Sequence, residues 1–452
     1  MVRLASSFSL LALASSAVAA PPWTAPHPGS PQSIKNLKDK IKNVVLITME
    51  NRSLDNLLGG QRLRGLENPI NNGPFCNPLN VTSLGAGKVC SKPNDFDSIL
   101  NDPDHSIHGN NLEFYGTFEP SDEDIQSSKL KPNMQGFVHE QIRIYTGKAD
   151  TTTLSEQVMN YYTEDQVPVI TSLSHNFVVF NHWHSGIPGP TDPNRAVITS
   201  GTSAGHGTND AGFGQHVLPQ RSIFQQLSET NHTWANYYST TNGADALYYN
   251  WTVSTGHNSA TYIKPLENFF QDAYLGRLPE FTYINPSCCG VGTTSMHPSG
   301  LISDGEVLLK QLYDAVRTGP QWKETLFIIT FDETGGFHDH VPPPLAPRPD
   351  NITYSETTPD GSTYTYNFDR LGGRLPTWLI SPWVQQGFVE QQGKNSAGQT
   401  ISYSAESTLR TLGYLWDFEP FNPRVEHAPS FDHLIGTRTN KAPAVMPAPH
   451  TF

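Results

Sequence analysis

Short runs of apolar and β-branched residues recur along the chain, and each run is typical of a buried strand. The clearest are residues 326–331, LFIITF, and residues 41–49, IKNVVLITM. Further runs of the same kind lie at residues 177–180, 233–238, 280–284 and 375–380. We therefore expect these segments to be strands of one buried sheet.

Segments with helical periodicity lie between these strands. They are residues 169–174, 221–229, 266–275 and 407–416. Ser303 and Glu306 form a capping-box pattern in front of another segment, whose apolar residues repeat on one helical face. Strands that alternate with helices predict βαβ units and a mostly parallel sheet, hence an α/β fold. Residues 59–135 have few periodic runs and are expected to be irregular.

Polar clusters follow three of the predicted strands at the point where each strand ends. Asp332 and Glu333 come directly after the first of the two clearest runs, and Glu50 and Asn51 after the second. The third cluster, GPTDPNR at residues 189–195, follows the strand at 177–180 and a short segment that contains His182 and His184. Because ligands bind at the carboxyl ends of strands in open α/β sheets, we expect the three clusters to form one site.

The adjacent acids Asp332 and Glu333 repel each other, so each has its pKa raised unless a positive charge lies nearby. A bound divalent cation usually neutralises such a pair of acids. The simpler alternative is that the two acids belong to a polar loop that caps the strand and bind no ligand. The glycines and histidines that follow the two acids favour a site. Oxygen ligands suit Mg²⁺, Ca²⁺ or Mn²⁺, and the nearby histidines also admit zinc or iron.

Thr191 lies between two prolines, which predicts a rigid turn that fixes its hydroxyl in place. A free threonine hydroxyl is a poor nucleophile, but coordination to a metal ion lowers its pKa and activates it. Such an arrangement suits attack on phosphorus, where positioning and charge neutralisation do most of the work.

The two ends of the chain indicate a secreted protein. Residues 1–20 have the pattern of a signal peptide, and no later apolar run is long enough to span a membrane. Residues 21–40 form a Pro-rich lead-in whose first part is expected to be flexible, residues 41–440 the catalytic domain, and residues 441–452 a Pro-rich tail. We expect a soluble protein secreted to the extracellular or cell-wall space.

The cysteines and the glycosylation sequons agree with secretion. Four cysteines allow three pairings, of which Cys76–Cys90 is our prediction. A bridge between the adjacent Cys288 and Cys289 would be strained, so other partners stay open. Sequons at Asn80, Asn231, Asn250 and Asn351 are candidates for glycans. Asn51 also lies in a sequon, but we expect it to be a buried ligand.

The formal net charge of −13 limits the partners of the protein. It argues against a non-specific nucleic-acid binder, which needs a basic face, and against strong adhesion to anionic membranes. It leaves room for an enzyme with a local positive pocket and for transient contact with a lipid surface.

Several motifs together resemble one known family. ENRSLDNLLG at residues 50–59 is similar to the ENRSFD motif of the phosphoesterase family that contains non-specific phospholipases C and related secreted acid phosphatases. GPTDPNR and DETGGFHDHVPPP resemble the second and third motifs of that family. Three shorter matches, DPDHS, MHPSG and RLPTWLISPW, follow the family's order between about residue 42 and the helix near Trp416.

This resemblance implies an alkaline-phosphatase-like fold, a three-layer α/β/α sandwich. It implies that Thr191 is a metal-bound nucleophile that forms a phosphothreonine. The implied ligands of one divalent metal ion are Glu50, Asn51, Asp332, Glu333 and Thr191. The implied phosphate pocket is lined by His105, His297 and His340, of which one would stabilise the phosphoryl oxygens and one would protonate the leaving alcohol.

Two departures from the family pattern stand out. Leu54 replaces the usual phenylalanine of the first motif, which is a mild apolar exchange. Ser404 and Ala405 stand where many relatives of the resembled family have an acid–histidine pair, and we expect this departure to affect substrate choice. Two neighbouring motif residues receive simpler roles: Asp55 is expected to cap the next helix, and Arg195 to hold its turn or to pair with Asp339 or a phosphate.

Our main hypothesis is a secreted metal-dependent phosphoesterase with phospholipase C-type activity on phospholipids. Acid phosphatase activity on phosphomonoesters is the close alternative. A non-catalytic protein that binds a phosphorylated ligand is a further alternative, supported by the Ser404–Ala405 departure and opposed by the retention of Thr191. A glycosidase needs two acids that flank a sugar bond, a geometry that adjacent Asp332 and Glu333 do not suggest.

Overall fold

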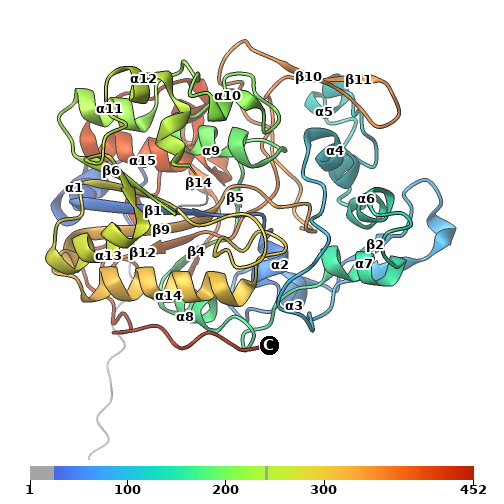
Figure 1. The fold of residues 1–452 in the computed structure, drawn as a ribbon, viewed down its shortest axis with the longest axis horizontal. Coiled ribbons are helices and arrows are strands. Elements are labelled where there is room, and N and C mark those ends of the chain that lie inside the picture. The colour runs from blue at the N-terminus through green and yellow to red at the C-terminus, as the bar shows by residue number, and fades with distance from the viewer. Residues whose placement is uncertain (1–24, 240–242) are drawn as a thin grey trace, which may run out of the picture.

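A computed structural model of the protein describes residues 25–239 and 243–452, so the predicted leader at residues 1–20 lies outside the described residues. An eight-stranded sheet forms the centre of the molecule, in the order β13-β4-β12-β9-β1-β8-β6-β7 (Figure 1). Its strands are β1 Asn43–Met49, β4 Val178–Phe180, β6 Trp234–Tyr238, β7 Ile263–Pro265, β8 Phe281–Asn285, β9 Thr325–Phe331, β12 Trp378–Ile380 and β13 Phe388–Glu390.

The middle of the sheet is the parallel group β8-β1-β9, whose strands were all predicted from the apolar runs. Leu46 of β1 lies opposite Tyr283 of β8 and Ile328 of β9, and every residue of β1 and β9 is buried. β12 runs antiparallel to both of its neighbours, while the remaining pairs are parallel. The mostly parallel sheet is therefore confirmed, with one reversed strand that the apolar pattern did not distinguish.

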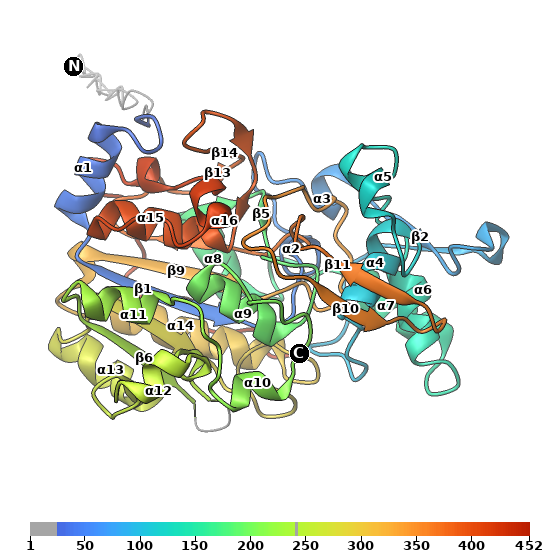
Figure 2. The ribbon, with the colours of Figure 1, turned by 90° about the horizontal axis from the view of Figure 1, so that it is seen from above.

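Helices cover both faces of the sheet, as Figures 1 and 2 show, which confirms the predicted α/β/α sandwich. On one face lie α8 Pro168–Asn176, α13 Leu266–Leu275 and α14 Ile302–Thr318, and on the other α1 Pro31–Lys40, α9 Thr191–Ser200, α11 Ile223–Glu229 and α15 Glu406–Trp416. Shorter helices are α2 Leu54–Leu58, α3 Pro69–Asn72, α10 Ala211–Gly214, α12 Asn250–Ser254 and α16 Pro423–His427. No helix in the described part of the chain is long and apolar enough to cross a membrane.

A smaller lobe extends from one end of the sandwich and has its own apolar cluster, which includes Phe114, Phe137 and Val158. Its elements are α4 Ile107–Tyr115, α5 Asp122–Gln126, α6 Phe137–Ile144, α7 Thr151–Met159, and the hairpins β2 Cys76–Pro78 with β3 Lys88–Cys90 and β10 Tyr354–Thr357 with β11 Thr363–Tyr366. The remaining short strands are β5 Trp183–His184, β14 Gly393–Lys394, β15 Thr400–Ile401 and β16 Tyr403–Ser404.

One expectation about an irregular segment is wrong. Residues 59–135 contain short helices and a hairpin, because the chain packs a small core there in spite of its weak periodicity. The second half of the lead-in, for which the sequence analysis predicted no element, is helix α1. This helix begins after the N-cap Ser30, and its Leu37 is buried in the main core.

The cysteines form two disulfides. Cys76 and Cys90 are joined across the β2–β3 hairpin, as predicted. The adjacent Cys288 and Cys289 are joined to each other, although the sequence analysis expected such a bridge to be strained and left other partners open.

The predicted capping box in front of α14 is also wrong. The helix begins at Ile302, and the hydroxyl of Ser303 donates a hydrogen bond to Asp97, whereas Glu306 is fully buried against α8. Glu306 Oε1 accepts a hydrogen bond from the backbone N–H of Ile170 at 2.8 Å, and its Oε2 atom has no partner among the described residues. Burial raises the pKa of Glu306 to about 8.

This burial predicts a pH-dependent loss of stability. The unfolded chain ionises Glu306 near pH 4.5, whereas the folded protein keeps the proton to about pH 8. The free energy of unfolding therefore falls as the pH rises across this range. We expect Glu306→Gln to change stability little at pH 4.5 and to stabilise the protein at pH 8, as measured by urea denaturation at both pH values. Glu267→Gln, the same exchange on the exposed face of α13, is the control; an equal pH slope for wild type and Glu306→Gln would contradict this assignment.

Candidate active site

The two central parallel strands deliver the first two polar clusters to the same edge of the sheet. β1 ends at Met49 and β9 at Phe331, and these residues are paired in register. The backbone N–H of Asn51 donates a hydrogen bond to Asp332 Oδ1 at 3.2 Å, so the two clusters are in direct contact. Asn51 has a φ of 53°, a left-handed conformation that asparagine tolerates better than most residues.

The third cluster joins them through helix α9. Thr191 is the first residue of this helix rather than part of a separate turn, and Pro190 is its N-cap residue. Thr191 Oγ1 lies 3.5 Å from Glu50 Oε2, to which it can donate a hydrogen bond. The structure therefore brings together Thr191 and the carboxylates at the ends of β1 and β9, as the sequence predicted.

Arg195, one helical turn after Thr191, is the central cation of this site. Its side chain is buried and donates to Glu50 Oε1 at 2.6 Å, to Asp332 Oδ2 at 3.2 Å and to Asp245 Oδ2 at 3.3 Å. The predicted pairing of Arg195 with Asp339 is wrong, since Asp339 pairs with a different arginine. Asp245 was missed by the sequence analysis, because it follows no predicted strand and belongs to no recognised motif.

The crowding of buried acids changes their proton affinity. Burial, together with the negative charge of Asp332, raises the pKa of Glu50 well above its ordinary value, although Arg195 acts in the opposite direction. Burial and the neighbouring Asp332 also raise the pKa of Glu333 to about 8, against the opposing charge of His105. The site therefore favours the binding of further positive charge, either protons or a cation.

Two oxygen atoms of the predicted ligand set are available for such a cation. Asn51 Oδ1 and Glu333 Oε1 are buried and have no hydrogen-bond partner in the described part of the chain. The other oxygen of Glu333 accepts from the backbone N–H of Gly335 at 2.5 Å, which holds the carboxylate in position. Buried amide and carboxylate oxygens without partners are the donors that a hard divalent cation takes, so these residues fit the predicted metal.

Two histidines and an aspartate form the adjoining wall. Ligand atoms of Asp102, His105 and His297 lie within 4.8 Å of one another. His105 Nδ1 lies 2.8 Å from the carbonyl oxygen of Pro103, and His297 Nδ1 contacts that of Pro298, so each ring is fixed by a backbone carbonyl. Burial alone would lower the pKa of His105, but Glu333 and Asp102 raise it to about 9, whereas burial lowers the pKa of His297.

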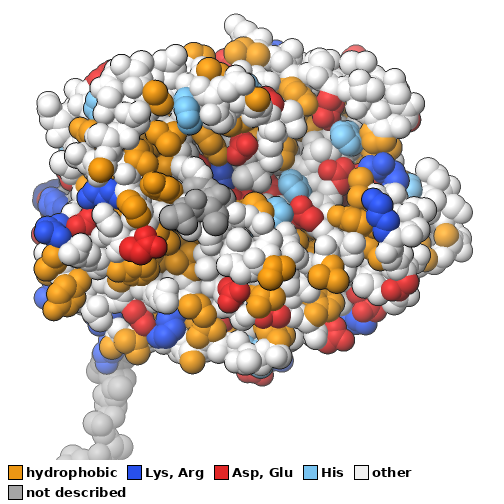
Figure 3. Space-filling model, viewed as in Figure 1, with side chains coloured by type: hydrophobic (Ala, Val, Ile, Leu, Met, Phe, Trp, Pro, Cys, Tyr) orange, Lys and Arg blue, Asp and Glu red, His pale blue; other side chains and the backbone are white. Residues whose placement is uncertain are grey.

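These groups line one cavity of about 580 Å³. Figure 3 shows a hollow in this face of the molecule, with acidic, basic and histidine side chains gathered in it. The cavity is lined by Glu50, Asp102, His105, Thr191, Asp192, Arg195, Asn209, Phe213, Gly214, His216, Gly243, Ala244, Asp245, Leu247, Tyr248, Asn285, Cys289 and His297. Of the predicted phosphate-binding histidines, His105 and His297 are thus placed beside Thr191.

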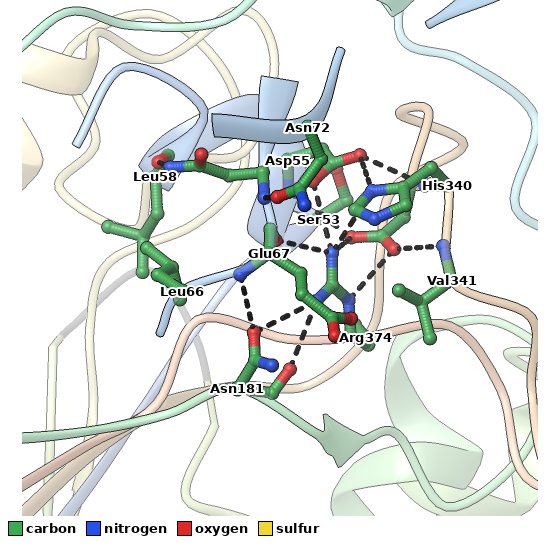
Figure 4. Close-up of polar contacts among 12 residues, drawn as sticks. Ser53, Asp55, Leu58, Leu66, Glu67, Asn72, Asn181, His340, Val341 and Arg374 are labelled. Atoms are coloured by element: carbon green, nitrogen blue, oxygen red, sulfur yellow. Dashed lines mark hydrogen bonds and ion pairs between the residues drawn. The ribbon is translucent and has the colours of Figure 1, made fainter. Parts of the chain in front are cut away.

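His340 is not among the described residues that line this cavity. It lies in the polar cluster around Arg374 that Figure 4 shows. Its Nδ1 atom is 2.7 Å from Asp55 Oδ2, and its ring stacks on Phe75 with centroids 3.9 Å apart. The fully buried Arg374 donates to Asp55 Oδ1 at 3.0 Å and to Asp339 Oδ1 at 2.9 Å. The predicted role of His340 at the phosphate is therefore not supported by this placement.

The Arg374 cluster connects the two segments that carry the predicted metal ligands. Asp55 follows Glu50 and Asn51 in the first motif, and Asp339 follows Asp332 and Glu333 in the third. The N-cap of α2 is Ser53, so the expected capping role of Asp55 is wrong. Asp55 instead binds the third motif, because its Oδ2 atom also accepts from the backbone N–H of His340 at 2.9 Å.

The Ser404–Ala405 departure lies away from the phosphoryl site. Both residues are buried, and β16 pairs with β5 at Ser404 and His184. Ser404 lines a separate cavity of about 190 Å³ together with Arg424 and His427. A direct effect of this departure on the cavity beside Thr191 is therefore not supported.

Comparison with known proteins identifies the family. The model of the Phosphoesterase family matches residues 41–419, which cover most of the chain and all three polar clusters. The chain belongs to the Phosphoesterase family. Membership confirms the prediction of a hydrolase that acts on phosphate esters.

Curated proteins named phospholipases C are similar to most of the chain. Non-specific phospholipase C6 of Arabidopsis thaliana is 32% identical over 424 residues, which are 90% of this chain and 75% of that protein. Non-hemolytic phospholipase C of Burkholderia pseudomallei is 25% identical over 402 residues, 78% of this chain and 53% of that protein. A solved protein of the alkaline phosphatase superfamily from Vibrio parahaemolyticus is 12% identical, covers 59% of this chain and 64% of its own, and has a TM-score of 0.36, which adds nothing to the fold described above.

The burial of Arg374 predicts a large effect of its removal. Arg374→Ala leaves Asp55 and Asp339 buried without their counter-charge, and we expect a loss of about 3–5 kcal/mol in the free energy of unfolding. Arg62→Ala, which removes an arginine that is 72% exposed and 3.8 Å from Glu164, should cost at most about 1 kcal/mol. Urea denaturation of both variants checks this prediction, and similar losses for the two would refute it.

Proposed function

We propose that this phosphoesterase is a secreted, metal-dependent enzyme that cleaves phospholipids in the manner of a phospholipase C, with Thr191 as its nucleophile. The observation that carries the proposal is the position of Thr191 Oγ1. It lies at the cavity, 3.5 Å from Glu50 Oε2 and next to a buried set of oxygen donors. No other hydroxyl in the described part of the cavity lining, apart from the phenol of Tyr248, is available for attack on phosphorus.

Glu50, Asn51, Asp332, Glu333 and Thr191 are the residues that would hold the single divalent cation. When bound, the cation would lower the pKa of the threonine hydroxyl and offset negative charge on the phosphoryl group. Arg195 keeps Glu50 and Asp332 in fixed orientations, because one oxygen of each carboxylate accepts a hydrogen bond from its guanidinium group. The second oxygen of each carboxylate does not bind this group. Arg195 is thus a positioning residue for this ligand set.

The reaction proceeds in two steps, and in each step one bond to phosphorus forms while another breaks. In the first, the bond from Thr191 Oγ1 to phosphorus forms, the bond to the leaving alcohol breaks, and the threonine hydroxyl releases its proton to water. In the second, water attacks the phosphothreonine and releases the phosphate product and free Thr191. His105, held positive by its acidic neighbours, stabilises the phosphoryl oxygens.

His297 is the better placed of the two histidines for proton transfer to the leaving oxygen. Its pKa is lowered by burial, and its Nε2 atom lies 3.6 Å from Asp102, which can stabilise the imidazolium form. His297 would give its proton to the alcohol in the first step and take one from water in the second. This assignment leaves His340 without a role at phosphorus, in agreement with its place outside the cavity.

Phospholipids are the proposed substrates because the curated relatives that match 90% and 84% of this chain are named non-specific phospholipases C. Secretion is proposed from the leader pattern and the sequons. Asn231, Asn250 and Asn351 are exposed and therefore accessible to glycosylation, whereas Asn51 is fully buried. The burial of Asn51 agrees with its proposed role as a ligand.

The nucleophile is tested with phospholipid vesicles and p-nitrophenyl phosphate as parallel substrates. Thr191→Ala should lose at least about 10³-fold in kcat on every substrate, because no other group replaces the attacking oxygen. Thr191→Ser, which keeps a hydroxyl, is the matched control and should retain part of the activity. Release of diacylglycerol by the wild type supports a phospholipase C, whereas cleavage of the monoester alone would mean an acid phosphatase. Full activity of Thr191→Ala would reject Thr191 as the nucleophile.

The metal site is tested by metal analysis after dialysis. Glu333→Gln keeps the size of the side chain but removes its charge, and we expect metal affinity to fall at least tenfold while the protein stays folded. Glu267→Gln is again the surface control. Wild-type metal content in Glu333→Gln would exclude Glu333 from the ligand set. Bound metal without turnover of any phosphate ester would favour the non-catalytic alternative.

A further inference from the structure

Three exposed apolar side chains lie on segments that also form the catalytic cavity. Leu100 and Val291 are each 85% exposed, and Leu301, the N-cap residue of α14, is 36% exposed. Leu100 lies two residues before Asp102, which lines the cavity. Val291 lies two residues after Cys289, which also lines it. We call Leu100, Val291 and Leu301 the apolar rim.

The segments that carry the apolar rim are in contact with one another. The hydroxyl of Ser98 donates a hydrogen bond to the carbonyl oxygen of Gly300 at 2.8 Å, which places two of these segments side by side. The third segment reaches the same point, because a Cβ atom added to Gly300 would lie 3.0 Å from the carbonyl oxygen of Gly290, the residue before Val291. The three side chains therefore lie on one group of packed segments beside the cavity.

Local contacts fix the turn that carries Val291. The hydroxyl of Thr293 donates a hydrogen bond to the carbonyl oxygen of Gly290 at 2.6 Å, and the disulfide between Cys288 and Cys289 constrains the residues in front of this turn. Because the turn is held in place before any partner binds, little conformational entropy is lost when the side chain of Val291 is covered.

The charge around the apolar rim indicates what kind of partner covers it. Residues 285–303 contain no Asp, Glu, Lys or Arg, although these residue types make up 16% of the chain. The ionised side chains that flank the rim in the sequence are acidic, at Asp95, Asp97, Asp102 and Asp304. A surface of this kind fits a zwitterionic lipid layer, whereas an anionic layer would be repelled by the acids and would need basic residues on the protein.

We propose that the apolar rim docks the enzyme on a zwitterionic lipid surface, with Leu100, Val291 and Leu301 buried at the boundary between headgroups and acyl chains. The proposal rests on the proposed function, because a lipid surface is the expected partner of an enzyme that cleaves phospholipids. A phospholipid in a layer reaches Thr191 only if the layer lies against the cavity, and the segments of the rim form part of the cavity lining. The strength of docking then depends on the apolar area that the lipid covers.

Chance exposure of apolar residues is the simpler alternative, because single exposed leucines and valines are common on soluble proteins. In that case the rim would affect lipid binding no more than any other exposed leucine does. Leu275 provides this comparison, since it is 46% exposed on α13, and the next residue, Gly276, lies close to Pro320 beyond the last turn of α14. Leu301 lies at the opposite end of this 17-residue helix, roughly 25 Å away along its axis.

Vesicle binding tests the proposal. Thr191→Ala protein, which leaves the lipid intact, is mixed with dioleoylphosphatidylcholine vesicles, and bound protein is separated by flotation. The combined exchange Leu100→Gln and Val291→Thr, which adds no charge, should lower the partition coefficient at least about tenfold. Leu275→Gln in the same background is the matched control and should leave it unchanged. Vesicles of dioleoylphosphatidylglycerol should bind less protein at low salt. No binding to the zwitterionic vesicles, equal binding of the rim variant and the control, or tighter binding to the anionic vesicles would overturn the proposal.

Activity measurements distinguish this proposal from the proposed function. With Thr191 intact, the rim variant should lose at least about tenfold in cleavage of phosphatidylcholine vesicles. It should keep its kcat/KM on p-nitrophenyl phosphate, which needs no lipid surface, and an equal loss on both substrates would overturn the proposal. Vesicle binding that depends on the rim, without cleavage of phospholipid, would support the rim and reject the phospholipase assignment alone. Phospholipid cleavage that the rim variant retains in full would reject the rim alone.

Discussion

The contact on which the site depends is the guanidinium group of Arg195 among Glu50, Asp332 and Asp245. Three carboxylates buried at one edge of the sheet would repel one another and would take up protons if no cation separated them. Arg195 supplies a fixed charge, and its planar group binds an oxygen of each acid in a defined direction. The strands that end at Met49 and Phe331 can therefore place acids side by side. Without the charge of Arg195, burial of these acids next to the apolar sheet would be unfavourable.

A second buried arginine stabilises the surroundings of this site. Arg374 holds Asp55 and Asp339, one residue from each of the two motifs that also carry the predicted metal ligands (Figure 4). The two arginines thus have different roles. Arg195 orients carboxylates at the cavity, whereas Arg374 joins the two loops behind it. His340 belongs to the second group, because its Nδ1 atom lies 2.7 Å from Asp55 and it is not among the described residues that line the cavity.

The cavity is lined by different groups on different sides. His105 and His297 lie beside Asp102, whereas Asp192 accepts a hydrogen bond from Tyr248, whose ring packs on Phe213. Thr191, at the start of α9, belongs to the same lining, and its hydroxyl lies 3.5 Å from Glu50 Oε2.

The sequence by itself determined the strands, the order of the polar clusters and their meeting at one sheet edge, because apolar runs report burial and parallel strands share their carboxyl ends. It also predicted the family and the placing of Glu50, Asp332 and Thr191 together. Only the tertiary structure decided the partners of buried charges: Arg195 meets Asp245 across 50 positions of sequence, and Glu306 meets Ile170 across 136. These pairs follow from how distant segments pack, and no local periodicity encodes them. The separate place of His340 was decided in the same way.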